Sequence, residues 1–142
     1  MSLLGEAIFA HLSHVAPLTA LLRTSADAPV RIYPIHLPQA PTYPAITYQI
    51  VSDERVFHHG GRSRLQLARV QFSIWGKDTD GGSGGYRSVQ AVAQALHEAL
   101  DGHDGAFGNH LVKCVPLGGR DLGESEPGIY HHAADFSVAF SE

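Results

Sequence analysis

The sequence predicts an α+β domain: a mostly antiparallel sheet of about four to five strands with a long hairpin, packed by an N-terminal helix pair and one longer central helix. Three patterns predict this class. Apolar residues recur at helical spacing near the start of the chain and again in residues 86–100. Residues 45–57 and 64–78 alternate apolar and polar side chains around a glycine-containing turn. A last alternating run occupies residues 129–140.

The first two helical segments are short. Ser2 is placed to cap the first helix, whose apolar positions are Leu3, Leu4, Ala7, Ile8, His11, Leu12 and Val15. Pro17 suits the first turn of a second helical piece, residues 17–23, because its missing N–H would have no partner there. The proline-rich stretch that follows predicts a short edge strand near Val30–Tyr33 and then an extended loop, because repeated prolines exclude a central strand.

The long hairpin has two predicted faces. The core face carries Ile46, Tyr48, Ile50, Ala68, Val70, Phe72 and Ile74, and the other face carries Thr47, Gln49, Arg69, Gln71 and Ser73. Because directly opposed residues lie on the same face, the two numbers of each pair must add to an even sum. A two-residue turn at Gly60 and Gly61 gives an odd sum. Either the turn has an odd number of residues, or a β-bulge intervenes.

The remaining elements follow a glycine-rich connection, residues 76–85, that we expect to be mobile. The central helix has an apolar stripe and is followed by Gly102, a residue suited to the C′ position. We expect a turn over residues 102–109, a short strand over 110–117 and a polar loop over 118–128. In the last strand we expect four residues toward the core: Ala134, Phe136, Val138 and Phe140.

Length and composition limit the possible functions. The 142 residues predict one domain, residues 1–142. A charged fraction of only 17% favours a protein with an interface, and a net charge of −4 gives no basic excess for nucleic-acid binding. The single cysteine, Cys114, indicates folding in a reducing cytoplasm. We expect no secretion signal and no membrane span.

The ten histidines raise the question of a metal site. Two adjacent pairs stand out, His58–His59 and His131–His132, but neighbours on a strand point to opposite faces, so each pair offers one ligand. Neither H-x-x-x-H on a helix nor C-x-x-C occurs. We therefore expect polar surface histidines and no metal or cofactor. A small histidine-dependent metalloenzyme remains the least favoured alternative.

Other catalytic patterns are also missing from the sequence. The glycine-rich stretch lacks the phosphate-binding G-x-x-x-x-G-K-[ST] pattern, and "DTDGG" lacks the remaining ligands of a calcium loop. Cys114 lies on an apolar strand, where a small buried side chain is usual, and no G-x-S-x-G occurs. Arginines gather around the hairpin, where they either protect an edge or meet a partner: Arg55, Arg62, Arg64 and Arg69.

Five stretches in order carry a family resemblance: "LLGEAIFAHL…VAPLTALL", "RIYPIHLPQAPTYPAITYQIVSD", "VQFSIWGKD", "YRSVQAVAQALHEAL" and "YHHAADFSVAF". Over residues 3–140 the chain resembles the tail completion proteins, or tail terminators, which join tail to head in long-tailed bacteriophages. The "DTDGGSGG" and "LGGRDLGESEPG" segments depart from the family pattern and put loop contacts in doubt, not the fold.

The resemblance implies a structural virion protein without catalytic residues. It implies a homo-hexameric ring that caps the tail tube, binds the major tail tube protein and offers a surface to the head-side connector. DNA would pass through the channel without sequence-specific binding. A head-closure or neck connector is the alternative. On this reading we expect ten residues at interfaces with ring neighbours or partners: Thr47, Gln49, Arg55, Arg62, Arg64, Arg69, Gln71, Ser73, Lys77 and Asp78.

Overall fold

A computed structural model describes residues 4–25, 27–58, 61–78, 84–107, 110–124 and 126–141, with side chains described outside 55–58, 61–64 and 110. The helices are α1 (Leu4–Leu12), α2 (Ala16–Thr19) and α3 (Gly85–Leu100). The strands are β1 (Ile32–Pro34), β2 (Ala45–His58), β3 (Gly61–Lys77), β4 (Asp104–Phe107), β5 (His110–Leu122) and β6 (Ile129–Ser141). No helix in these ranges is long and apolar enough to cross a membrane.

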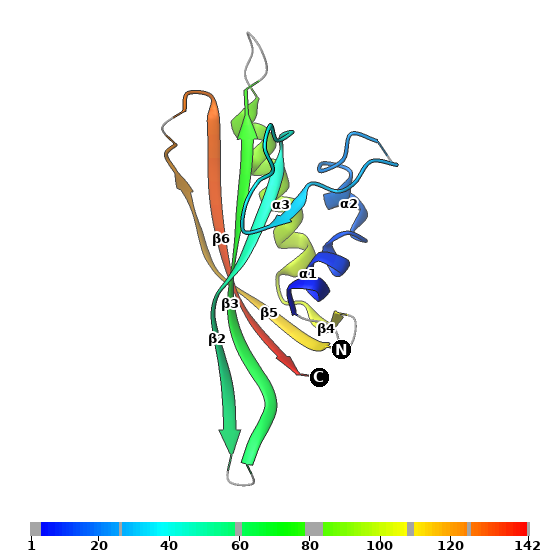
Figure 1. Ribbon diagram of the computed structural model, residues 1–142, viewed down its shortest axis with the longest axis vertical. Helices are drawn as coiled ribbons and strands as arrows, with labels where there is room; N and C mark the ends of the chain where they lie inside the picture. The colour runs from blue at the N-terminus through cyan, green and yellow to red at the C-terminus, as the bar shows by residue number, and fades with distance from the viewer. Residues whose placement is uncertain are drawn as a thin grey trace.

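The six strands form one sheet in the order β1-β2-β3-β6-β5-β4. Only the β1–β2 pair is parallel, and the other four pairs are antiparallel. The sheet is strongly twisted, all three helices lie on one side of it, and the β2–β3 hairpin extends beyond the other elements (Figure 1). The predicted α+β class is therefore confirmed.

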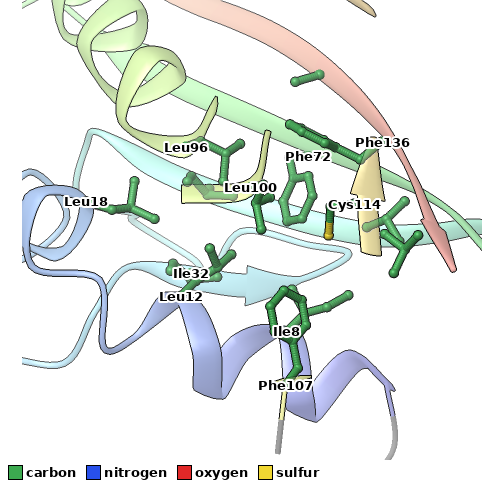
Figure 2. Packing of buried hydrophobic residues seen from close by; sticks show 14 of the residues in the cluster. Ile8, Leu12, Leu18, Ile32, Phe72, Leu96, Leu100, Phe107, Cys114 and Phe136 are labelled. Atoms are coloured by element: carbon green, nitrogen blue, oxygen red, sulfur yellow. The ribbon is translucent and has the colours of Figure 1, made fainter. Parts of the chain in front are cut away.

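The core lies between the helices and the even-numbered residues of β3 and β6. Val70, Phe72 and Ile74 are buried there, as predicted, and the ring of Phe72 meets that of Phe136 edge to face, with centroids 5.6 Å apart. Helices α1 and α3 contribute Ile8, Leu12, Leu96 and Leu100 from the other side (Figure 2). Cys114 is 1% exposed among these residues, the expected environment for a structural cysteine.

The hairpin register bears out the bulge alternative. Near the turn, His58 opposes Gly61, an odd sum, whereas Ile46 opposes Ile74 and Ile50 opposes Val70, which are even sums. The ladder shifts between Ile50 and Ser52, where β2 contains one extra residue. This bulge restores the core face after a turn of the wrong parity.

The structure corrects the sequence prediction at several elements. A sixth strand, β4, lies within the predicted turn, and β5 runs to Leu122, through all of the predicted short strand and residues 118–122 of the predicted polar loop. β5 continues through two glycines, and each glycine has a local reason. Gly118 has φ +137° beside a bulge. Gly119 leaves space for His132, because a Cβ at Gly119 would lie 2.9 Å from His132 Nε2. Ile50, expected in the core, is 41% exposed, because it lies beyond Tyr48, where the pairing of β1 with β2 ends.

The helix predictions hold with smaller changes. Pro17 lies in the first turn of α2, which ends earlier than predicted, at Thr19. Gly102 has φ +66°, as the C′ position after α3 requires. Tyr86, expected in the apolar stripe of α3, is exposed and donates a 2.7 Å hydrogen bond to Asp121. Ser2 lies outside the described residues.

Candidate interface on the helix-free face of the sheet

The side of the sheet opposite the helices, hereafter the helix-free face, carries the odd-numbered residues of β3 and β6. The register brings several predicted interface residues together on it: Thr47 opposes Ser73, and Gln49 opposes Gln71. Arg69 and Lys77 follow on the same face of β3, and both are exposed. Cross-strand pairing thus gathers six of the ten predicted residues on one surface.

Near the C-terminal end of β3, the side chains of this face form a cluster of contacts within the subunit. Trp75 stacks on its cross-strand partner His131, with ring centroids 3.9 Å apart and planes 17° apart. The Trp75 indole N–H donates a 3.1 Å hydrogen bond to Thr47 Oγ1, and His131 Nδ1 lies 2.7 Å from Glu124 Oε1. Thr47 is only 5% exposed. Its hydroxyl therefore acts inside the subunit.

The middle of the face holds a carboxylate between two arginines. Asp135 is buried, and its Oδ2 lies 2.7 Å from Arg69 Nη2 and 3.5 Å from Arg120 Nη1. Both arginine side chains are about half exposed, and Asp135 Oδ1 has no hydrogen-bond partner among the described residues. Two guanidinium groups for one carboxylate leave one net positive charge with unused donors. This site can bind a carboxylate or carbonyl groups of another protein.

Sequence reasoning placed Asp135 outward but missed Arg120, which it assigned to a loop. The available signal was a lone acidic residue between apolar residues of a strand, since an isolated carboxylate in a sheet needs a cationic neighbour. Which strand supplied that neighbour depended on the continuation of β5 through Gly118–Gly119, and the sequence did not reveal this.

Asp78 holds the start of α3. The Gly85 N–H donates to Asp78 Oδ1 (3.0 Å), and the Tyr130 hydroxyl donates to Asp78 Oδ2 (3.3 Å). The Asp78 N–H in turn donates to the Gly128 carbonyl (2.9 Å). A carboxylate at a helix N-terminus satisfies free N–H groups and favours the helix dipole. Asp78 thus has a structural part inside the subunit.

Three predicted interface arginines lie in the projecting hairpin. The backbone places Arg55 in β2 and Arg62 and Arg64 in β3, and their side chains lie outside the described part. The hairpin extends away from the helices (Figure 1). Residues 79–83 of the predicted mobile connection also lie outside the described residues.

Two described histidines lie beside carboxylates in pairs that bring no further metal ligand with them. His97 lies 2.9 Å from Asp101, and His132 Nδ1 lies 2.8 Å from Asp121 Oδ1. Within the described ranges, no three side chains from His, Cys, Asp and Glu are close enough to bind one metal ion. His58 and His59 lie outside the described side chains.

A second aromatic cluster joins α1 to β4. His11 stacks on Phe107 with ring centroids 4.2 Å apart, and His103 lies 4.9 Å from His11. Burial lowers the pKa of His11, and the neighbouring His103 lowers it further. The Nε2 atoms of both histidines are buried and have no partner among the described residues.

A helix-covered sheet with an uncovered face of polar, charged and apolar residues defines the class of structural subunits that meet other proteins. The chain belongs to the family described as Tail completion protein gp17, whose model matches residues 6–141. It is therefore a structural, non-enzymatic component of a phage-like virion tail. The family assignment sets aside the metalloenzyme alternative.

A solved structure supports the fold. A chain in the structure titled "Virion of native gene transfer agent (GTA) particle" matches this chain with a TM-score of 0.74 and 18% sequence identity. The match covers 98% of this chain and 95% of that chain. A search of curated proteins finds no match.

Proposed function

We propose that this chain, as a single tail-terminator-like domain spanning residues 1–142, forms a homo-hexameric ring on the end of the tail tube. The ring binds the major tail tube protein on one side and the head-side connector on the other. DNA passes through its channel without sequence-specific binding. The family membership supports a place at the tail, and the remaining detail is our proposal.

The observation that carries the proposal is the uncovered face of β3, β6 and β5. A ring needs heterologous contacts, in which one patch meets a different patch of the next subunit. The arginine pair around Asp135 supplies charge for such a contact, and Gln49, Gln71 and Ser73 supply polar groups with little desolvation cost. We assign Arg55, Arg62, Arg64 and Lys77 to the same interfaces. Thr47 and Asp78 support them from inside the subunit.

The test is a deletion of the gene in the parent particle, examined by electron microscopy. We expect separate filled heads and tails, or overlong tails, and we expect added purified protein to restore joining. Normal infectious particles from the deletion would contradict the proposal. Co-purification with filled heads in place of tails would favour the head-closure alternative.

A further inference from the structure

Arg120 is the less engaged of the two arginines beside Asp135. Its Nη1 lies 3.5 Å from Asp135 Oδ2, whereas Arg69 Nη2 lies 2.7 Å from the same oxygen. One carboxylate neutralises one guanidinium, and the shorter distance gives that role to Arg69. Arg120 therefore keeps its positive charge and most of its N–H donors on a side chain that is 55% exposed. A guanidinium in this state fits a second carboxylate.

Arg120 also lies on an open lateral edge of the sheet. β4 pairs with β5 only as far as Lys113, so the rest of this edge has no partner strand among the described residues. The Cys114 N–H points to this side, where it donates to the His103 carbonyl, and Pro116, two residues further on, has no N–H to offer there. Because proline blocks strand pairing at an edge, contacts here depend on side chains.

The opposite lateral edge of the sheet offers a carboxylate. β1 pairs with β2 only as far as Tyr48, so the edge of β2 is open beyond that residue. Glu54 is an exposed residue of this open stretch, and none of the described side chains forms an ion pair with it. It opposes Leu67 and therefore lies on the helix-free face, as Arg120 does.

The charges around Glu54 leave it available to a partner. Arg69 is the nearest cation on the same face, and it is already held in the 2.7 Å ion pair described above. Lys113 shares the rung of Glu54 but lies three strands away, about 14 Å at a spacing of about 4.8 Å per strand. The other charged residues of this part of β2, Asp53 and Arg55, fall on the alternate rungs.

The acidic residues that follow Arg120 in the chain are engaged elsewhere. Asp121 accepts a 2.7 Å hydrogen bond from the Tyr86 hydroxyl on the helix-covered side. Glu124 lies 2.7 Å from His131 Nδ1. Neither carboxylate is therefore placed to neutralise Arg120 inside the subunit.

The two edges are complementary only to each other. A contact between two β5 edges would bring two Arg120 side chains together, and a contact between two β2 edges would bring two Glu54 side chains together. Only a β5 edge against a β2 edge joins opposite charges. Such a contact is heterologous, because different edges of the two copies meet, and repetition of it can close a ring.

We propose that Arg120 of one subunit pairs with Glu54 of a second copy of this chain. This inference rests on the proposed ring and names one lateral contact in it. The two arginines beside Asp135 then have separate parts: Arg69 holds the buried carboxylate within the subunit, and Arg120 meets the neighbouring copy.

Charge reversal at either residue should break the contact. Arg120→Glu and Glu54→Lys each oppose like charges, and we expect each to lose about tenfold in self-association by sedimentation velocity and in retention on terminator-free tails. Arg120→Gln and Glu54→Gln remove one charge without repulsion and should lose less. The glutamine variants keep the test valid if Arg120→Glu destabilises the subunit beside Asp135.

Two matched controls separate this contact from a general effect of charge. Asp53→Lys reverses the carboxylate next to Glu54 in the chain, but on an alternate rung of the ladder. Arg87→Glu reverses an exposed arginine of α3, outside both edges. We expect both controls to be retained on tails as wild type.

Mixing the two charge-reversed variants tests the direction of the contact. Each contact between an Arg120→Glu subunit and a Glu54→Lys subunit again joins opposite charges, whichever edge each subunit contributes. The mixture should therefore recover retention as an alternating ring, which a hexamer can close because its subunit number is even. The double variant Arg120→Glu/Glu54→Lys should recover retention alone.

The proposal is overturned if the stable single variants are retained as wild type, or if neither the mixture nor the double variant recovers. Recovery of Arg120→Glu by Asp53→Lys in place of Glu54→Lys would also overturn it. If wild-type protein restores head–tail joining and both charge-reversed variants do so equally well, this contact alone is wrong. If wild-type protein fails to restore joining, the proposed function itself is wrong.

Discussion

Arg69 and Asp135 form a 2.7 Å ion pair across β3 and β6, on the face of the sheet that no helix covers. The Asp135 carboxylate is buried, whereas the Arg69 guanidinium is half exposed. Arg69 and Arg120 both approach the same oxygen, Asp135 Oδ2. The pair therefore stabilises the subunit and also presents charge to a neighbour.

Arg69→Met should destabilise the subunit. The substitution leaves the buried carboxylate of Asp135 with only the longer contact to Arg120, and we expect a loss of about 1–2 kcal/mol in urea unfolding. Asp135→Asn keeps an acceptor and removes the buried charge, so its loss should be smaller, under about 1 kcal/mol. Equal losses in the two variants would show that the buried charge does not govern this site.

The pH dependence of stability should report His11. Its pKa lies below the ordinary histidine value of 6.5 in the folded state, because burial and His103 disfavour the charged form, with a smaller effect from His14. The unfolded chain therefore binds more protons just below pH 6.5. The contribution of neutral His11 to the free energy of unfolding is fully present above pH 6.5 and falls as the pH drops below that value.

Urea unfolding at about pH 7.5 and about pH 5.5 measures this effect. His11→Phe keeps an aromatic ring on Phe107 and removes the titrating group, so the variant should lose less stability on acidification than wild type. His36→Gln, at an exposed histidine, is the control and should match wild type. The same pH dependence in His11→Phe and wild type would contradict the assignment.

Gly76→Ala should be strongly destabilising. A Cβ at this position would lie 2.5 Å from Val89 Cγ2 and 2.7 Å from the Gly85 carbonyl oxygen, so β3 and α3 could not approach as closely. We expect a loss of about 2–3 kcal/mol. Gly123→Ala is the control, because nothing lies within 4 Å of its added carbon. A neutral Gly76→Ala would mean that the strand and helix separate without cost.

Thr47→Val tests whether Thr47 acts inside the subunit. The substitution keeps the shape and removes the acceptor of the Trp75 indole N–H, and we expect a loss of about 1–2 kcal/mol. Thr47→Ser retains the hydroxyl and should restore most of that stability. If Thr47→Val were neutral in stability but defective in assembly, Thr47 would belong to an interface.

Periodicity and register parity were enough to predict the central hairpin. The buried even-numbered residues of β3 appear as strict alternation. The parity of their pairing required either an odd-membered turn or a bulge, and the structure has a bulge after Ile50. Both signals are local, because they depend on strand geometry and on a single turn.

The surface across β5 could not be predicted in the same way. Gly118 and Gly119 read as a loop, but the need for space beside His132 depends on a residue 13 positions away in the sequence. Because the predicted strand ended before Gly118, the sequence prediction also missed the pairing of Arg120 with Asp135. The sequence also could not show that Leu65 and Leu111 share a rung, because both residues oppose Ser141 only in the register of β3, β6 and β5.

The most direct measurement is a cryo-electron microscopy reconstruction of the head–tail junction in the assembled particle. We predict a ring of this chain on the tail tube, with the helix-free face covered by a neighbouring copy. A reconstruction in which this face is bare to solvent, or in which an ion or ligand lies among the histidines, would contradict the account.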